Sequence, residues 1–315
     1  MIETSICGLL GIQHPVLQGG MAWISDAVLA SAVSNAGGLG IIAAGNAEPE
    51  YVRNEINKAK ELTDRPFAVN IMLISPHAEA VAQVVIDEGV KVVTTGAGNP
   101  AKYMKQWISS GIKVIPVIAS VGLAKLAARS GAAAVIAEGG EAGGHVGDIT
   151  TLALVPQVCS AVDIPVIAAG GIGDGRGVAA AFMLGASGIQ SGTRFLVAKE
   201  CGIHQNYKNK IIAAKDIDTI TTGKRLGHPV RSLKTPFSRG FFAKEYDSSI
   251  TNEELETLGE GALKLAVEDG DLQNGCFLAG QASGLVKKEQ SAKDIVEEIM
   301  NEAETILKGA TAWVK

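Results

Sequence analysis

The sequence lacks the features that mark secreted, metal-binding or nucleic-acid-binding proteins. Its four cysteines form no CxxC pair and no other metal-ligand spacing. No metal site is therefore predicted, and a reduced, cytoplasmic compartment fits this cysteine usage best. The net charge of -5 leaves no positive surplus to neutralise a phosphate backbone, which argues against nucleic acid as a partner.

Long uninterrupted apolar segments are also missing. The amino terminus has no basic patch followed by a long apolar stretch, so no signal peptide is predicted. Apolar stretches further along are broken by charges such as Lys125, Arg129 and Asp174, which argues against a membrane span. The 315 residues, 47% of them hydrophobic, suffice for one large domain with an extensive core, with or without a small appendage.

Eight short apolar runs recur along the first two thirds of the chain. They are PVLQG at 15–19, LGIIAA at 39–44, FAVNIM at 67–72, VVTTGAG at 92–98, KVIPVI at 113–118, AVIAEG at 134–139, VIAAGG at 166–171 and GIQSGT at 188–193. Their apolar character is nearly continuous rather than alternating, which is typical of parallel strands covered on both faces.

Segments of helical periodicity separate these runs. They span 26–35, 49–61, 77–88, 100–110, 121–130, 150–162 and 174–184, and Asp26 is well placed to cap the first. Eight strands alternating with helices predict an α/β fold of the TIM, or (β/α)8, barrel type. A doubly wound open sheet is the alternative, and the absence of GxGxxG after the first strand makes it the weaker one.

Residues 201–270 differ in composition from the rest of the chain. They are rich in polar and charged residues and contain no run of the barrel-strand type. We interpret them as a small, mainly helical second domain, or lid, beside the barrel mouth. The barrel would then comprise residues 1–200 and 271–315, and an amphipathic helix at 291–307 would close it.

The ends of the last two predicted strands have the composition of an anion-binding site. Phosphate in such barrels is commonly held by the loops after strands seven and eight. Here these loops contain Gly170 and Gly171, and then the run Gln190, Ser191, Gly192 and Thr193. Exposed backbone N–H groups, two hydroxyls and a helix starting just beyond would suit a phosphate, so we predict a phosphate-bearing ligand.

Other strand ends suggest a ring system beside that phosphate. Gly20 would let the main chain lie against a flat ligand, and Met21 would supply soft contact. Asn70 interrupts an apolar strand, so its amide could pair with a heterocycle edge or be satisfied by backbone. A glycine-rich loop at 139–147 contains His145, which is either a catalyst or a solvated histidine in a turn. Together these residues describe a mononucleotide lying across the barrel mouth.

Nine motifs occur along the chain in this order: QGGMAW, GGLGIIAAGN, FAVNIML, TTGAGNPAKYM, AEGGEAGGHVG, IPVIAAGGIGDGRG, QSGTRF, GHPVR and AGQASGLV. Over almost its whole length the chain resembles the FMN-dependent enoyl-acyl-carrier-protein reductases, within the nitronate monooxygenase superfamily. The resemblance implies FMN, NADH or NADPH as hydride source, and an enoyl thioester on acyl carrier protein. A homodimer and activation by a monovalent cation are further expectations of it.

The resemblance and the strand-end pattern assign a set of residues to the flavin. These are Gly20, Met21, Ala22, Asn70, Glu138, Gly143, Gly144, Gly170, Gly171, Gln190, Ser191, Gly192 and Thr193. By the same resemblance, His145 would stand over the substrate side of the ring and donate a proton or polarise the carbonyl, with water as the alternative donor. His228 and Arg231 either receive the nicotinamide or the phosphopantetheine of the carrier, or belong to a solvated basic stretch.

Two rival functions accompany this interpretation. A nitronate monooxygenase would share the barrel and flavin, and His145 would act as base on an alkyl nitro compound or nitronate with oxygen as oxidant. Many such enzymes carry Gln where this chain has Glu138, and they lack close matches to GHPVR and AGQASGLV, which favours the reductase. A flavin-free phosphate-binding barrel, either an isomerase or a ligand-binding module, is the other rival.

Overall fold

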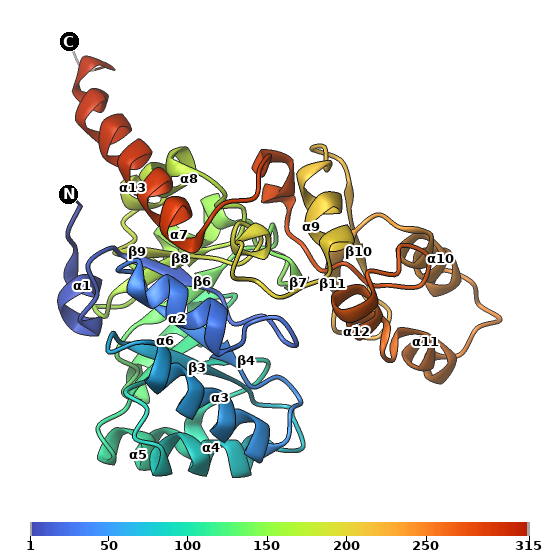
Figure 1. Ribbon diagram of the computed structural model, residues 1–315, viewed down its shortest axis with the longest axis horizontal. Helices are drawn as coiled ribbons and strands as arrows, with labels where there is room; N and C mark the ends of the chain where they lie inside the picture. The colour runs from blue at the N-terminus through green and yellow to red at the C-terminus, as the bar shows by residue number, and fades with distance from the viewer. Residues whose placement is uncertain (1, 314–315) are drawn as a thin grey trace.

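Eight parallel strands form a nearly closed barrel with helices between them in the computed structural model, which describes residues 2–313 (Figure 1). The strands are β1 (Val16–Gln18), β2 (Gly40–Ala43), β3 (Phe67–Met72), β4 (Val92–Gly96), β5 (Lys113–Ile118), β6 (Val135–Glu138), β8 (Val166–Ala169) and β9 (Gly188–Ser191). Their order is β1-β9-β8-β6-β5-β4-β3-β2, and an isolated parallel bridge between Leu17 and Leu39 joins the two ends. The predicted (β/α)8 barrel is thus confirmed.

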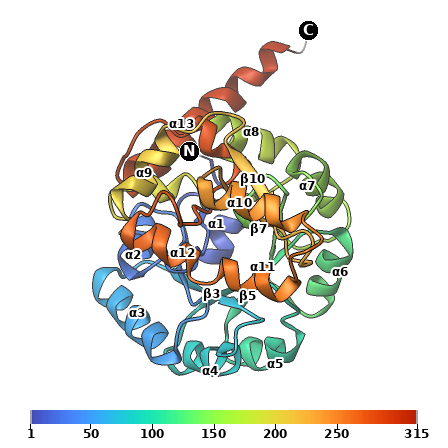
Figure 2. The same cartoon turned by 90° about the vertical axis from the view of Figure 1, so that its right-hand side faces the viewer.

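A ring of helices covers the outside of the barrel (Figure 2). It consists of α2 (Ala27–Asn35), α3 (Pro49–Leu62), α4 (Ala78–Asp87), α5 (Ala101–Ser109), α6 (Val121–Arg129), α7 (Thr151–Cys159), α8 (Gly175–Met183) and α13 (Ala292–Gly309). The Asp26 carboxylate accepts from the Leu29 N–H at 2.9 Å, as its position before α2 predicted. Ser291 caps α13 in a reciprocal capping box, which explains the sharp start of this last helix.

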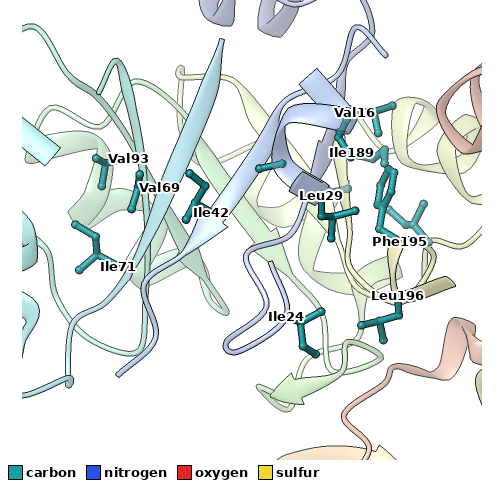
Figure 3. Close-up of a cluster of buried hydrophobic side chains, with 14 of the residues drawn as sticks. Val16, Ile24, Leu29, Ile42, Val69, Ile71, Val93, Ile189, Phe195 and Leu196 are labelled. Atoms are coloured by element: carbon teal, nitrogen blue, oxygen red, sulfur yellow. The ribbon is translucent and has the colours of Figure 1, made fainter. Parts of the chain in front are cut away.

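Both faces of the sheet are buried. Val16, Ile42 and Val69 point outward from their strands into a large cluster beneath the surrounding helices (Figure 3). Alternate residues such as Ile136 fill the barrel interior, where α1 (Ser5–Leu10) closes the amino-terminal end with Ile6. This double burial is the reason why the strands read as continuous apolar runs.

Residues 201–270, which we call the cap, lie at the opposite end of the barrel from α1. The cap holds α9 (Gln205–Ile212), β10 (Thr219–Thr222), β11 (Val230–Leu233), α10 (Pro236–Glu245), α11 (Asn252–Gly259) and α12 (Ala262–Lys264). In Figure 1 helices α10 to α12 stand to one side of the barrel, and in Figure 2 they lie in front of its axis. The cap therefore covers the barrel mouth.

The strands of the cap were not predicted from the sequence. β10 and β11 are antiparallel partners, and β11 also pairs with β7 (Gly144–His145), a two-residue strand in the loop after β6. Most of their side chains are only partly buried, so these strands lack the apolar runs by which the barrel strands are recognised. Within residues 2–313, no helix combines the length and the apolar character that crossing a membrane requires.

Candidate active site

A cavity of about 630 Å³ opens at the carboxyl ends of the barrel strands, beneath the cap. The strand alternation explains its floor. Ala68 and Ile136 point into the barrel interior, and the inward positions two residues further on are Asn70 and Glu138. Apolar packing thus gives way to polar groups one layer below the mouth, as expected for the functional end of such a barrel.

The predicted site residues converge on this cavity with one exception. All thirteen residues assigned to the flavin line it, together with His145 and His228. Arg231 does not. The lining also includes residues that were not assigned to the site from the sequence, among them Val117, Glu141, Leu278, Ala279, Gly280 and Ala282.

One end of the cavity presents a cradle of backbone amides. Within residues 2–313, the N–H groups of Gly171, Ile172 and Gly173 find no acceptor in the protein, nor do those of Gly192 and Thr193. Gly171 has φ 74°, a left-handed conformation that glycine adopts without strain. Unpaired amides of this kind form a concave anion site, so the geometry suits a phosphate.

The helix after this cradle does not contribute to it, contrary to the expectation from the sequence. The first N–H of α8, from Gly175, donates to the Glu302 carboxylate at 2.7 Å. The next two amides donate to Asp174. Because two carboxylates already occupy the start of α8, an anion must be held by the loops alone.

The two hydroxyls of the cradle are also engaged. Ser191 donates its proton to the Ile172 carbonyl at 2.9 Å, which ties the loop after β9 to the loop after β8. Thr193 Oγ1 accepts from the Gly280 N–H at 2.9 Å, so its own proton stays available. Only Thr193 can therefore offer the predicted hydroxyl contact to a phosphate without breaking a bond.

A flat wall of small residues continues from the cradle. A Cβ on Gly20 would lie 2.5 Å from the Asn70 Cβ, so glycine is required for this close approach. The Asn70 amide group donates to Thr94 Oγ1 at 2.9 Å. The NH2 group thus donates to a side chain rather than to backbone, and the carbonyl oxygen and the second N–H are available to a ligand.

Glu138 lies at the floor of the same cavity. Burial raises the pKa of its carboxyl to about 7, because a desolvated carboxylate is costly. Near neutral pH this group is therefore balanced between its neutral and charged forms. It can donate a hydrogen bond in one form and accept in the other.

His145 lies on the exposed side of the cavity, in β7. Its ring centroid is 6.3 Å from that of His228, which comes from the loop between β10 and β11. Two imidazoles therefore share the mouth, whereas the sequence indicated only His145 over the ring. Partial burial against the cavity wall lowers the pKa of His145, with the neighbouring His228 as a second cause. The neutral form of His145 consequently predominates at pH 7.

Arg231 and His228 are close in the sequence, but only His228 lines the cavity. The guanidinium of Arg231 donates from Nε and Nη2 to the Gly140 carbonyl, at 3.1 and 2.9 Å. A third bond, from Nη1, reaches Thr219 Oγ1 at 3.2 Å. Arg231 is thus directed at the base of the loop that carries His145.

Glu141 is the most informative of the missed residues. Both of its carboxylate oxygens accept from the Thr151 N–H, at 3.1 and 2.9 Å, and one also accepts from the Thr151 hydroxyl at 2.9 Å. Glu141 therefore joins the loop at 139–150, which carries His145, to the start of α7. The motif EAGGH contained this residue, but nothing in the sequence pairs it with a threonine ten positions later.

The fold and the site together define a (β/α)8 barrel with a mononucleotide-type pocket and histidine at its mouth. A model of the nitronate monooxygenase family matches residues 3–82 and 77–302. The chain therefore belongs to the nitronate monooxygenase family. The family and the structural neighbours indicate a flavin-dependent oxidoreductase.

Three similar proteins refine this placement. The structure of FabK from Thermotoga maritima is 47% identical, covers 100% of both chains and superposes with a TM-score of 0.97. A (3aS,4S,5R,7aS)-5-hydroxy-7a-methyl-1-oxo-octahydro-1H-indene-4-carboxyl-CoA dehydrogenase from Rhodococcus jostii is 34% identical over 96% of each chain. A probable nitronate monooxygenase from Staphylococcus saprophyticus is 33% identical over 97% of this chain and 99% of its own.

The residues present fit FMN. The unpaired amides of the loops after β8 and β9 suit its phosphate, and the wall at Gly20 leaves space for a ring. Asn70 and Glu138 offer polar groups to the edge of that ring. Among residues 2–313, no three His, Cys, Asp or Glu side chains gather as metal ligands would.

Proposed function

We propose that the protein reduces trans-2-enoyl thioesters on acyl carrier protein, using NADH or NADPH through bound FMN. The observation that carries the proposal is a pocket with an anion cradle at one end and His145 at its open side. The full-length likeness to FabK supports this substrate class. The Rhodococcus relative, whose name describes a CoA thioester, supports a thioester carbonyl as the group recognised.

Four residues of the site would have distinct roles in this reaction. The amides of Gly171 and Gly192 would hold the FMN phosphate, and Asn70 would orient the ring. Bound FMN would supply the hydride chemistry. His145, in its neutral form, would donate a hydrogen bond to the thioester carbonyl and so polarise the enoyl group. Either His145 or water then delivers the proton to the α-carbon.

Oxidation of alkyl nitronates with oxygen is the second candidate function. The family model and the staphylococcal relative favour it. The lowered pKa of His145 is also compatible with it, because a base must be unprotonated before it can accept a proton.

One pair of assays separates these functions. The FMN-loaded protein is mixed with crotonyl-acyl-carrier-protein and NADH or NADPH, and in parallel with propionate-3-nitronate and oxygen. NAD(P)H consumption without the enoyl thioester is subtracted as the control. We expect thioester-dependent oxidation of NADH or NADPH in the first mixture. Turnover in the second mixture alone would overturn the proposal, and a protein that takes up no FMN would point to the flavin-free barrel.

A further inference from the structure

The histidine loop, residues 139–150, contains few features that would fix its conformation from within. It contains five glycines, and its only strand, β7, has two residues. Glycine has more backbone freedom to lose than other residues. One backbone bond, from Gly140 N–H to Ile149 O at 2.9 Å, closes the loop at its base. The fixed position of His145 must therefore come from contacts outside the loop.

Glu141 supplies one such contact, to Thr151 at the start of α7, and the cap supplies others through its backbone. His145 pairs with Val230, and Gly144 pairs with Arg231, in antiparallel register. The Val146 N–H donates to the Pro229 carbonyl at 3.0 Å. Figure 1 shows β7 and β11 side by side where the barrel meets the cap. A pairing of two residues is marginal by itself, so on the side of the cap a side-chain contact must support it.

Arg231 is placed to be that anchor. Two of its N–H groups converge on the Gly140 carbonyl, 91 positions away in the sequence. Its third bond reaches Thr219 on the neighbouring strand β10, so the guanidinium links the loop base to two strands of the cap. The planar fork of arginine makes such a paired contact with fixed geometry, which the single ammonium of lysine cannot reproduce.

We propose that Arg231 is a positioning residue, whose guanidinium holds Gly140 and so fixes His145 over the cavity. The proposal rests on the proposed function only in assigning His145 a task on the substrate. Arg231 itself does not line the cavity, which distinguishes this role from direct binding of an anionic substrate. Movement of the hairpin β10–β11 would carry the histidine with it.

Three variants test the proposal on the FMN-loaded protein. Arg231→Ala removes the hydrogen bonds to the Gly140 carbonyl, and Arg231→Lys keeps the charge without the planar guanidinium. Arg239→Ala, the control, removes an exposed arginine of α10 in the same cap. The readout is the pKa of His145 from NMR of histidine ring protons, assigned by comparison with His145→Gln. Thermal unfolding and flavin content report whether each variant folds.

In Arg231→Ala we expect the pKa of His145 to rise toward 6.5, because the released loop is more solvated. We expect kcat for the enoyl thioester to fall roughly tenfold to a hundredfold, with KM for NADH or NADPH nearly unchanged. Arg231→Lys should show the same changes at smaller size. Arg239→Ala should leave both the pKa and kcat as in the natural protein.

An unchanged pKa of His145 in Arg231→Ala overturns the proposal, whatever the assays show. A raised KM with unchanged kcat and pKa also overturns it, because that pattern means direct substrate binding. If Arg231→Ala does not fold, Arg231→Lys and Thr219→Val decide by the same NMR readout. A pKa that responds in a protein without reductase activity contradicts the proposed function and leaves the positioning role standing.

Discussion

The two ends of the pocket are built on different principles. The anion end consists of backbone amides at Gly171–Gly173 and Gly192–Thr193, within a few residues of β8 and β9. The histidine end depends on the cap, through β11 and a guanidinium 91 positions from its acceptor. The candidate anion site is thus built from local segments of the barrel, and the proposed chemistry depends on a tertiary contact. The two should be separable by mutation.

The largest expected effect comes from removing the imidazole at the histidine end. His145→Ala should lower kcat for the enoyl thioester by about two to four powers of ten, and flavin absorbance should be retained because the anion end is untouched. Turnover and bound FMN are measured on the same preparation, with His77→Ala as a control. Undiminished turnover would remove the catalytic role of His145 and break the comparison.

Glu138, on the cavity floor between the two ends, is tested through the pH dependence of the free energy of unfolding. The raised pKa of Glu138 means that the folded state holds its proton more tightly than the unfolded state, whose pKa is about 4.5. This stabilisation is complete below pH 4.5 and is lost as pH rises to about 7. The loss is at most about 3–4 kcal/mol, because each pKa unit corresponds to about 1.36 kcal/mol. Denaturant unfolding of the apoprotein from pH 5 to 8 should show this slope, and Glu138→Gln should flatten it. Equal slopes in both proteins would contradict the assignment.

A glycine substitution sharpens the comparison at the anion end. Gly171→Ala forces a Cβ into a left-handed conformation, which costs about 1–2 kcal/mol, and tilts an amide of the cradle. Gly89→Ala imposes the same conformation at an exposed turn where a Cβ meets nothing within 4 Å. Both should lower the free energy of unfolding. Only Gly171→Ala should weaken FMN binding, by about tenfold, and equal affinities by fluorescence titration would refute the amide cradle.

The smallest effect concerns a second contact between cap and barrel. The Lys264 ammonium in α12 lies 5.7 Å from the ring centroid of Trp23, in the loop after β1. Lys264→Gln should lower the free energy of unfolding by about 0.5–1 kcal/mol. Lys264 also pairs with Glu268 at 3.7 Å, so Glu268→Gln is the matched control. If the two variants lose the same stability by urea unfolding, the ring contact contributes nothing.

Most of the barrel could be predicted because its signals are local. The burial of strands such as Phe67–Met72 on both faces produces an apolar run, and Asp26 caps the helix that directly follows it. Gly170, Gly171 and Gly173 allowed the anion site to be predicted, because the backbone conformation at a glycine depends on the residue itself. The blocked start of α8 was not predictable, since Glu302 comes from the last helix.

Sequence alone determined the barrel, the residues at its strand ends and the presence of a histidine beside glycines, because periodicity and glycine content act over a few neighbouring positions. Tertiary structure alone decided that His228 faces His145, that Arg231 turns away from the cavity to hold Gly140, and that Glu138 is desolvated. These outcomes depend on which distant segments the fold brings within hydrogen-bonding reach. No local pattern carries that information.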